Sequence, residues 1–387
     1  MKRILVLFCL ISFSCGGKIG NGNSRVFKEI HEYVLNLDRY TSPVEEYIQY
    51  VPNWKGKEVF AIHVRGMFEI KLYDFTTNEL LETLKYSHEG PKAYPNTYDF
   101  HIHDENNIFM NRRYHYRAHL VNQHFDLIKT FEFLDPGTKV DPVSGIPLSG
   151  KTFLPMFNHN KIFKKFPDKF ILTASPDISS YDPKKFYADC LLINVELETG
   201  EISRVKGYPE KMHGKAWGVL HSYIYTDYSE RKEQYFLSYA ADEELYVEND
   251  KFERIASFSA KPEKFKEIKA IPVNAVFNDP VYMTHYNEQF VFGSVLYDEH
   301  RDLIYRIALE PNPNYGDTYT KDPLHEPRNM IVMAFDSNYE KIAEMRLEQS
   351  EDGVYLDRCF VNEKGLNITY VDLNNEDKLY FKTFLVE

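Results

Sequence analysis

Paired apolar and aromatic runs recur along this chain, and their spacing constrains the fold more than any other feature. Each pair is joined by a short polar turn, as where the runs 191–197 and 202–205 flank Glu-Thr-Gly-Glu. Runs of this length on both sides of a polar turn predict a β-hairpin. The hairpins return at intervals of roughly 50 to 60 residues, which is typical of blades with loop insertions. The six predicted hairpins lie at 68–86, 116–133, 191–205, 244–258, 330–347 and 366–385.

These repeats predict an all-β, six-bladed β-propeller that occupies residues 36–387 as a single domain. A blade must stack on its neighbours to bury both faces of its sheet, and a closed ring leaves no long unprotected edge. An aromatic content of 15%, with 29 Tyr and 28 Phe, favours strands as well. The alternative is a pair of β-sandwich domains, but no linker rich in Pro, Gly or Ser divides the body.

Few segments depart from the strand pattern. Residues 25–37 carry a weak helical period, and the stretch 135–155, which contains four prolines, predicts a long loop over one face of the ring. A second such loop is expected at 312–327.

The first fifteen residues predict where the protein works. Lys2 and Arg3 form a short basic start, residues 4–13 are almost wholly apolar, and Ser14 places a small residue before Cys15. This layout is typical of a bacterial lipoprotein export signal. The apolar run is also shorter than the about 20 residues that a membrane-spanning helix needs.

Cleavage before Cys15 would make this cysteine the lipid anchor. Residues 1–14 are then the signal peptide and residues 15–35 a lipid-anchored tether, which attaches the protein to a membrane through its N-terminal lipid. Because no acidic pair follows the anchor, we expect the outer membrane, facing the periplasm. Simple secretion is the alternative, since Ser12 stands where the usual lipoprotein motif has Leu.

Charge and cysteine content narrow the function classes. The 46 basic and 58 acidic residues give a net charge of −12, which argues against a nucleic-acid partner because phosphate attraction needs positive charge. Cys190 and Cys359 remain in the body of the chain, either as a disulfide or as separate buried residues. No cysteine spacing suggests zinc, and no cofactor is expected.

The segment 295–306 reads Val-Leu-Tyr-Asp-Glu-His-Arg-Asp-Leu-Ile-Tyr-Arg. It resembles the signature of an uncharacterised Bacteroidetes lipoprotein family, a domain of unknown function. That signature has two adjacent tyrosines, and in this chain Ile304 stands in place of one of them. The hairpin at 330–347 follows it as in that family. The resemblance implies a six-bladed β-propeller in the cell envelope, and it implies no activity because none is established for the family.

This signature is also the candidate binding site. The guanidinium groups could hydrogen-bond to a carboxylate or a sugar hydroxyl of a ligand, and the tyrosines could stack on that ligand. The alternative is a structural network that locks neighbouring blades together. The residues concerned are Tyr297, Asp298, Arg301, Asp302, Tyr305 and Arg306.

Two further motifs carry weaker signals. His101 and His103 stand at alternate positions of a predicted strand, so both imidazoles could face one metal ion, with His63 or His159 as a third ligand. A polar sheet face is the alternative. Residues 145–152 match the phosphate-binding loop pattern, but Pro147 and the missing strand and helix favour a surface loop.

No catalytic motif stands out in the chain, and its many acidic pairs are typical of solvated turns. We therefore expect a binding or scaffold module for a protein, peptide or glycan partner, acting through one face of the propeller. The alternative is an envelope hydrolase, such as a glycosidase, with carboxylates lining the channel. Two close carboxyl groups in the channel would favour the hydrolase, and an aromatic channel the binder.

Overall fold

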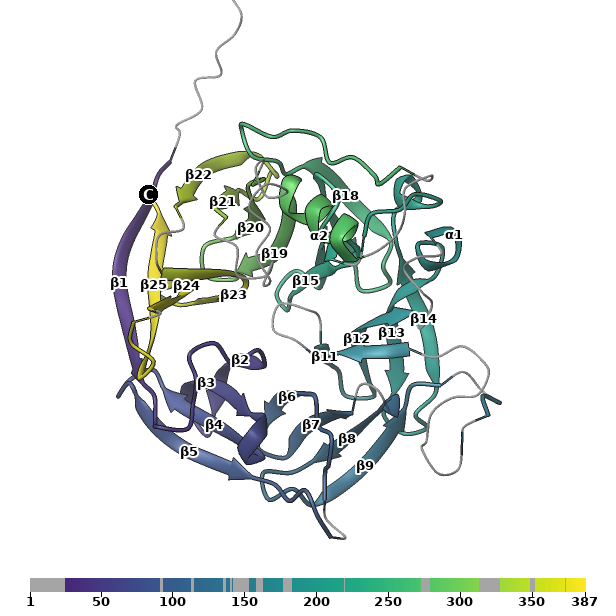
Figure 1. Cartoon of the computed structure of the whole chain (residues 1–387), viewed down its shortest axis with the longest axis vertical. Helices are drawn as coiled ribbons and strands as arrows, with labels where there is room; N and C mark the ends of the chain where they lie inside the picture. The colour runs from purple at the N-terminus through teal and green to yellow at the C-terminus, as the bar shows by residue number, and fades with distance from the viewer. Residues whose placement is uncertain are drawn as a thin grey trace, which may run out of the picture.

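Six small sheets stand in a ring in the computed structural model (Figure 1). The structure describes residues 25–90, 93–112, 115–134, 137–139, 141, 153–157, 163–176, 183–218, 220–272, 279–312, 328–348, 352–372 and 374–387.

The first three blades follow one another along the chain. Blade 1 contains β2 (Ile48–Trp54), β3 (Lys57–Val64), β4 (Glu69–Asp74) and β5 (Glu79–Lys85). Blade 2 contains β6 (Asp99–Asp104), β7 (Asn107–Arg112), β8 (Arg117–Val121) and β9 (Leu127–Glu132). Blade 3 contains β10 (Phe153–Met156), β11 (Phe163–Lys165), β12 (Lys169–Pro176), β13 (Cys190–Glu196) and β14 (Ile202–Gly207), with both β10 and β11 paired to β12.

The other three blades complete the ring. Blade 4 contains β15 (Ile224–Ser229), β16 (Gln234–Tyr239), β17 (Glu244–Asn249) and β18 (Arg254–Ser259). Blade 5 contains β19 (Val291–Asp298), β20 (Leu303–Leu309), β21 (Met330–Phe335) and β22 (Lys341–Leu347). Blade 6 contains β23 (Asp352–Asn362), β24 (Gly365–Asp372), β25 (Lys378–Val386) and β1 (Phe27–Asn36).

The strands of each blade pair in antiparallel fashion, and β2, β6, β11, β15, β19 and β23 lie nearest the axis of the ring (Figure 1). Among the described residues, the α-helices are α1 (Pro183–Phe186), between two strands of blade 3, and α2 (Asp279–Glu288), between blades 4 and 5. No helix in the described part of the chain is long and apolar enough to cross a membrane.

The ring of six sheets confirms the predicted six-bladed propeller. The alternative, a pair of β-sandwich domains, is wrong. In five blades the predicted hairpin is the outer pair of strands, for example β13 with β14 and β21 with β22. In blade 6 it is the central pair, β24 with β25. The predicted hairpins and their spacing were therefore correct. In blades 1 to 5 the strand beside the axis was not part of any predicted hairpin.

The N-terminal strand closes the ring, which corrects two predictions. Residues 25–37 were expected to be a helix and residues 15–35 a tether, but Phe27–Asn36 form β1, which pairs with β25 along its length. The amide of Val26 also donates to the carbonyl oxygen of Glu387 at 2.9 Å. The helix prediction was wrong because the open edge of β25 offers backbone partners to β1, and such pairing overrides a weak local period.

The predicted loops lie mostly outside the described residues. Residues 142–152, which include the phosphate-loop match, and residues 313–327 are among those that are not described. The loop at 135–155 was expected to run through Pro155. That residue instead lies in β10, where it pairs with Ala174 of β12.

Aromatic side chains fill the spaces between blades. Phe60 of blade 1 packs against Phe381 of blade 6, with ring centroids 4.8 Å apart, and Tyr50 stacks on Phe360 of β23 at 4.1 Å. Such contacts explain the high aromatic content, because flat rings fill the interface between two twisted sheets. Cys190 of β13 and Cys359 of β23 are both buried and are not joined by a disulfide.

Candidate binding site in the central channel

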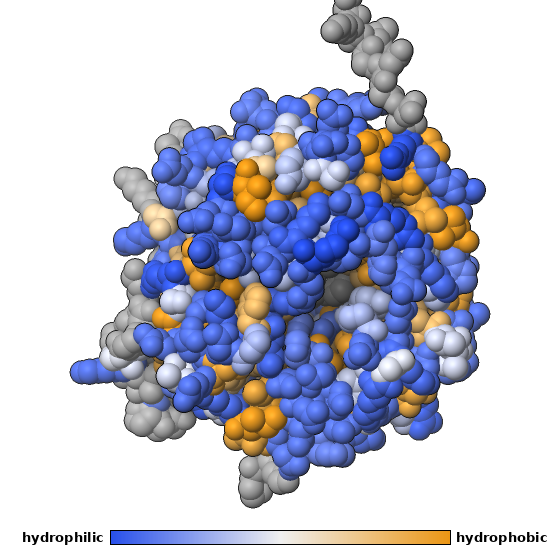
Figure 2. Space-filling model, turned by 180° about the vertical axis from the view of Figure 1, so that it is seen from behind, coloured by the Kyte–Doolittle hydropathy of each residue, from blue (hydrophilic) through white to orange (hydrophobic). Residues whose placement is uncertain are grey.

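A cavity of about 490 Å³ lies where the innermost strands meet. All six blades contribute to its lining through β2, β6, β11, β15, β19 and β23. On the face opposite to that of Figure 1, Figure 2 shows a hollow near the middle of a mostly hydrophilic surface. We refer to this cavity as the channel. It is the site at which residues far apart in the sequence converge.

The geometry of an innermost strand decides which side chains meet. Successive side chains of a strand point to opposite faces, and in a propeller each face looks toward a neighbouring blade. In β11, Lys164 lies beside Tyr228 of blade 4, with its ammonium 5.2 Å from the ring centroid. Phe163 lies against His101 of blade 2, at 4.2 Å between centroids. Alternation along this short strand therefore gives the channel two different walls.

The wall between blades 3 and 4 carries paired charges. Lys164 forms an ion pair with Glu230, which follows β15. Asp227 of β15 accepts hydrogen bonds from the backbone amides of Tyr297 at 2.7 Å and Tyr228 at 2.8 Å. Burial raises the pKa of Asp227 to about 6, although both amides and Lys164 favour its ionised form. Burial likewise lowers the pKa of Lys164.

The wall between blades 2 and 3 carries the two histidines of the predicted metal site. As expected from their alternate positions, His101 and His103 both line the channel. His103 has 36% of its side chain exposed, and its Nε2 lies 3.8 Å from Oδ2 of Asp104. Burial, together with the charges of Lys165 and Lys164, lowers the pKa of His103.

Neither of the possible third metal ligands, His63 and His159, is placed beside His101 and His103 in the described structure. His63 lies in β3, where its Nε2 is 2.7 Å from the hydroxyl of Tyr86, and His159 is not among the described residues. Among the residues that the structure describes, no group of three or more His, Cys, Asp or Glu side chains is placed to hold a metal ion.

The 297–306 signature divides between the channel and the interior of blade 5. Tyr297 of β19 lines the channel and donates its hydroxyl to Asp302 at 2.6 Å. Asp302 also forms an ion pair with Lys232, and Arg231 donates to the Tyr297 hydroxyl at 2.8 Å. These contacts bring two of the six predicted residues together at the junction of blades 4 and 5.

The other four residues of the signature lie behind the channel. Asp298 is buried and binds Arg301 at 3.0 Å, and it accepts a hydrogen bond from the Tyr305 hydroxyl at 3.4 Å. Arg306 is 0% exposed and donates to the carbonyl oxygens of Asp242, Glu243 and Ala260 in blade 4. Its guanidinium also lies 3.8 Å from the centroid of the Phe292 ring. This arrangement ties blade 5 to blade 4.

Sequence reasoning missed the charged groups of the channel. The charged groups concerned lie in two short innermost strands, β11 with Lys164 and Lys165, and β15 with Asp227. Neither strand belongs to a hairpin that was predicted from the sequence. The available signal was a charged residue inside an otherwise apolar and aromatic run, as for Asp227 in Ile-Tyr-Thr-Asp-Tyr-Ser. That signal has meaning only when the run is known to border the axis.

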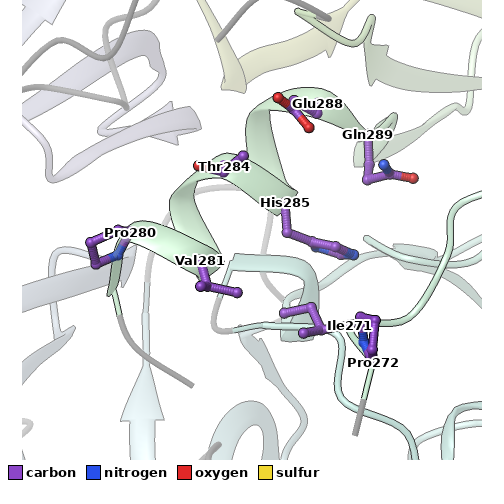
Figure 3. Close-up of a pocket in the computed structure, with 8 residues that line it drawn as sticks. All are labelled: Ile271, Pro272, Pro280, Val281, Thr284, His285, Glu288 and Gln289. Atoms are coloured by element: carbon purple, nitrogen blue, oxygen red, sulfur yellow. The ribbon is translucent and has the colours of Figure 1, made fainter. Parts of the chain in front are cut away.

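A second cavity, of about 390 Å³, lies under α2 and shares no lining residue with the channel (Figure 3). Ile271, Pro272 and Val281 give it an apolar floor. His285 is held there by the carbonyl oxygen of Lys269, 2.5 Å from its Nε2. Its polar lining residues, Thr284, His285, Glu288 and Gln289, come from α2 and the residue after it, whereas all six blades contribute to the channel. The channel is therefore the stronger candidate for specific recognition.

Solved structures share this fold. A protein of the DUF4221 family from Bacteroides vulgatus superposes with a TM-score of 0.77 at 18% sequence identity, covering 94% of this chain and 99% of that chain. A second solved structure is that of a Bacteroides fragilis protein whose name describes it as an exported protein. It superposes with a TM-score of 0.56 at 9% sequence identity, covering 93% of this chain and 95% of that chain. Among curated proteins, none matches this sequence.

The family model of a domain of unknown function, DUF4221, matches residues 26–346. This match extends from the first residues of β1 to the end of blade 5 and includes the 295–306 segment. It confirms the resemblance to a domain of unknown function that this segment indicated. The chain belongs to the DUF4221 family.

Proposed function

We propose that this protein is a lipid-anchored binding module of the bacterial cell envelope and that its ligand, part of a protein, a peptide or a glycan, enters the central channel. The observation that carries the proposal is the convergence of all six innermost strands on one cavity of about 490 Å³. Pockets of this size that combine apolar walls with a few polar groups are typical of ligand sites.

The lining favours binding over hydrolysis. The lining is aromatic at Tyr228, Tyr297 and Phe163, and the partly exposed ring of Tyr228 suits stacking on a sugar ring or on an apolar side chain. A glycosidase needs two carboxyl groups free to act on one bond. Here both oxygens of Asp227 accept backbone amides, and Glu230 is paired with Lys164 and 72% exposed.

The envelope location rests on the N-terminal sequence. The layout of residues 1–14 before Cys15 supports export and acylation. The Bacteroides fragilis protein of similar fold is also described as exported, which agrees with this placement. We place the anchor in the outer membrane, with the propeller facing the periplasm, so that the channel opens to periplasmic ligands.

The anchor is tested by mass spectrometry of the protein purified from its own envelope. We expect an N-terminal peptide that begins at Cys15 and carries acyl chains, and we expect Cys15→Ser to appear in the soluble periplasmic fraction without lipid. A mature chain that retains Met1 would contradict both export and anchoring.

Ligand binding is tested by native mass spectrometry of the same envelope-derived protein, with the lipid-bearing peptide removed by proteolysis. We expect a non-covalent mass adduct that is lost in His103→Trp, which narrows the channel. A matched control is Leu127→Trp on the outer strand β9, where the side chain is exposed, and this variant should keep the adduct. An adduct that survives equally in both variants would place the ligand outside the channel.

A further inference from the structure

The two charged walls of the channel differ in how their charges are balanced. Between blades 3 and 4, the ammonium of Lys164 is paired with Glu230 and also interacts with Asp227. The next residue, Lys165, also lines the channel, and it lies two residues after Phe163, which packs against His101 of blade 2, so strand alternation turns Lys165 toward the wall between blades 2 and 3. Of the described residues, no carboxylate lies within 4.0 Å of the Lys165 ammonium.

The acid beside His103 on this wall, Asp104, is already engaged. Oδ1 of Asp104 accepts the amide of Asn106 at 2.8 Å and the side-chain amide of Asn107 at 2.9 Å. These bonds hold the carboxylate in the turn between β6 and β7. Asp104 therefore stabilises the turn. On this wall it contacts His103, with 3.8 Å between Oδ2 and Nε2.

Lys165 is notable because it lines the channel without a carboxylate partner. Other lysines of this acidic chain, whose net charge is −12, are paired at the surface, as Lys57 is with Asp74 and Lys261 with Glu243. An unpaired ammonium inside a cavity is costly unless water or a ligand solvates it. Low-dielectric walls also strengthen its attraction for an anion.

We propose that Lys165 and His103 form a subsite for the anionic group, a carboxylate or a phosphate, of the ligand that occupies the channel. Lys165 supplies the positive charge, and the imidazole of His103 supplies an N–H donor next to it. One step along the same strands, His101 packs against Phe163, and both residues line the channel next to this subsite, where the remainder of the ligand would lie. This inference rests on the channel being the ligand site.

The test measures the reactivity of Lys165 directly. The protein is acetylated with N-hydroxysuccinimide acetate in chloride, phosphate or acetate at equal ionic strength, and peptide mass spectrometry gives the rate at each lysine. A bound anion holds the ammonium in its unreactive form. At an anion concentration tenfold above Kd, we expect Lys165 to react roughly tenfold more slowly than in chloride.

An internal control is present in every digest. Lys251, an exposed residue in the turn between β17 and β18, should react at the same rate in all three salts. Protection of Lys165 by phosphate alone would identify a phosphate-bearing ligand, and protection by acetate alone a carboxylate. The variant His103→Phe should weaken the protection several-fold, because the second donor is lost.

Equal rates at Lys165 in all three salts would overturn the subsite. If the envelope-derived adduct is still lost in His103→Trp, the channel remains the ligand site and only its anion specificity fails. If anions protect Lys165 but no adduct forms, the subsite holds and the proposed envelope ligand fails. The two experiments therefore separate the two proposals.

Discussion

The guanidinium of Arg306 in blade 5 donates a hydrogen bond from Nη2 to the carbonyl oxygen of Asp242 in blade 4, over 2.6 Å. Three further bonds reach Ser238, Glu243 and Ala260 in the same neighbouring blade. Arg358 of blade 6 repeats this arrangement with the carbonyl oxygens of Pro43, Val44 and Glu45 ahead of blade 1. Buried arginines thus join successive blades through loop carbonyls.

Arg306→Met should lower the free energy of unfolding by about 3 to 5 kcal/mol, because several buried carbonyl oxygens lose their donor at once. Denaturant unfolding followed by circular dichroism measures this change. Arg346→Met, whose side chain is nearly half exposed in two surface ion pairs, should leave the midpoint almost unchanged. Equal effects of both substitutions would show that Arg306 does not join the blades.

Leu35→Ala should cost about 2 to 5 kcal/mol, because Leu35 of β1 is fully buried between the first and last blades. Ile30→Ala is the matched control on the same strand, since Ile30 is 41% exposed. The measurement is chemical denaturation of a chain that begins at Arg25.

Truncation separates the strand from the tether. A chain that begins at Arg25 should unfold at the same temperature as the mature protein. A chain that begins at Asp38 lacks β1 and should lose its cooperative transition, because the edge of β25 and the core around it become exposed. An unchanged melting curve for the second chain would show that β1 is dispensable.

The carboxyl group of Asp227 should titrate with an apparent pKa of about 6, measured by 13C NMR of aspartate-labelled protein. Its ordinary value is 3.8, so between these two pH values the native state binds the extra proton. The contribution of this group to stability is therefore greatest below the unfolded pKa and is lost as the pH rises through about 6.

Two substitutions should move this pKa in opposite directions. Lys164→Gln removes a nearby positive charge and should raise the pKa of Asp227, whereas Glu299→Gln removes a negative charge and should lower it. Shifts of the same sign in both variants would contradict the placement of Asp227 between these charges.

Both cysteines of the body should be unreactive toward Ellman's reagent in the native chain that begins at Arg25. Cys190 and Cys359 are buried, and burial raises the pKa of the Cys190 thiol. In denaturant without reductant, two thiols per chain should react. A count of zero would show that the two residues form a disulfide.

The sequence by itself was sufficient for the fold class. Hairpins such as those at 191–205 and 330–347 carry their own turn and their own two apolar runs, so each is determined locally. Regular spacing of such units leaves few architectures that bury both faces of every sheet. The family resemblance at 295–306 agreed with the same conclusion.

The candidate site could be predicted only in part. His101 and His103 were singled out, and they do line the channel, as does Tyr297. Arg306 was named as a candidate ligand residue or as a structural one, and its hydrogen bonds lead to loop carbonyls of blade 4. A sequence pattern shows that an arginine is present near an aspartate, but the burial that decides its partners depends on the neighbouring blade.

Two features were decided by the tertiary structure alone. The edge of β25 recruits residues 27–36 as a strand, although their local period suggested a helix, because unpaired backbone groups at a sheet edge are satisfied by pairing. Likewise Lys164 and Lys165, adjacent in sequence, lie on opposite faces of β11, and of the two only Lys164 has a carboxylate partner among the described residues. Ring closure brings strands from six distant segments to one axis, and the chemistry of the channel exists only after that closure.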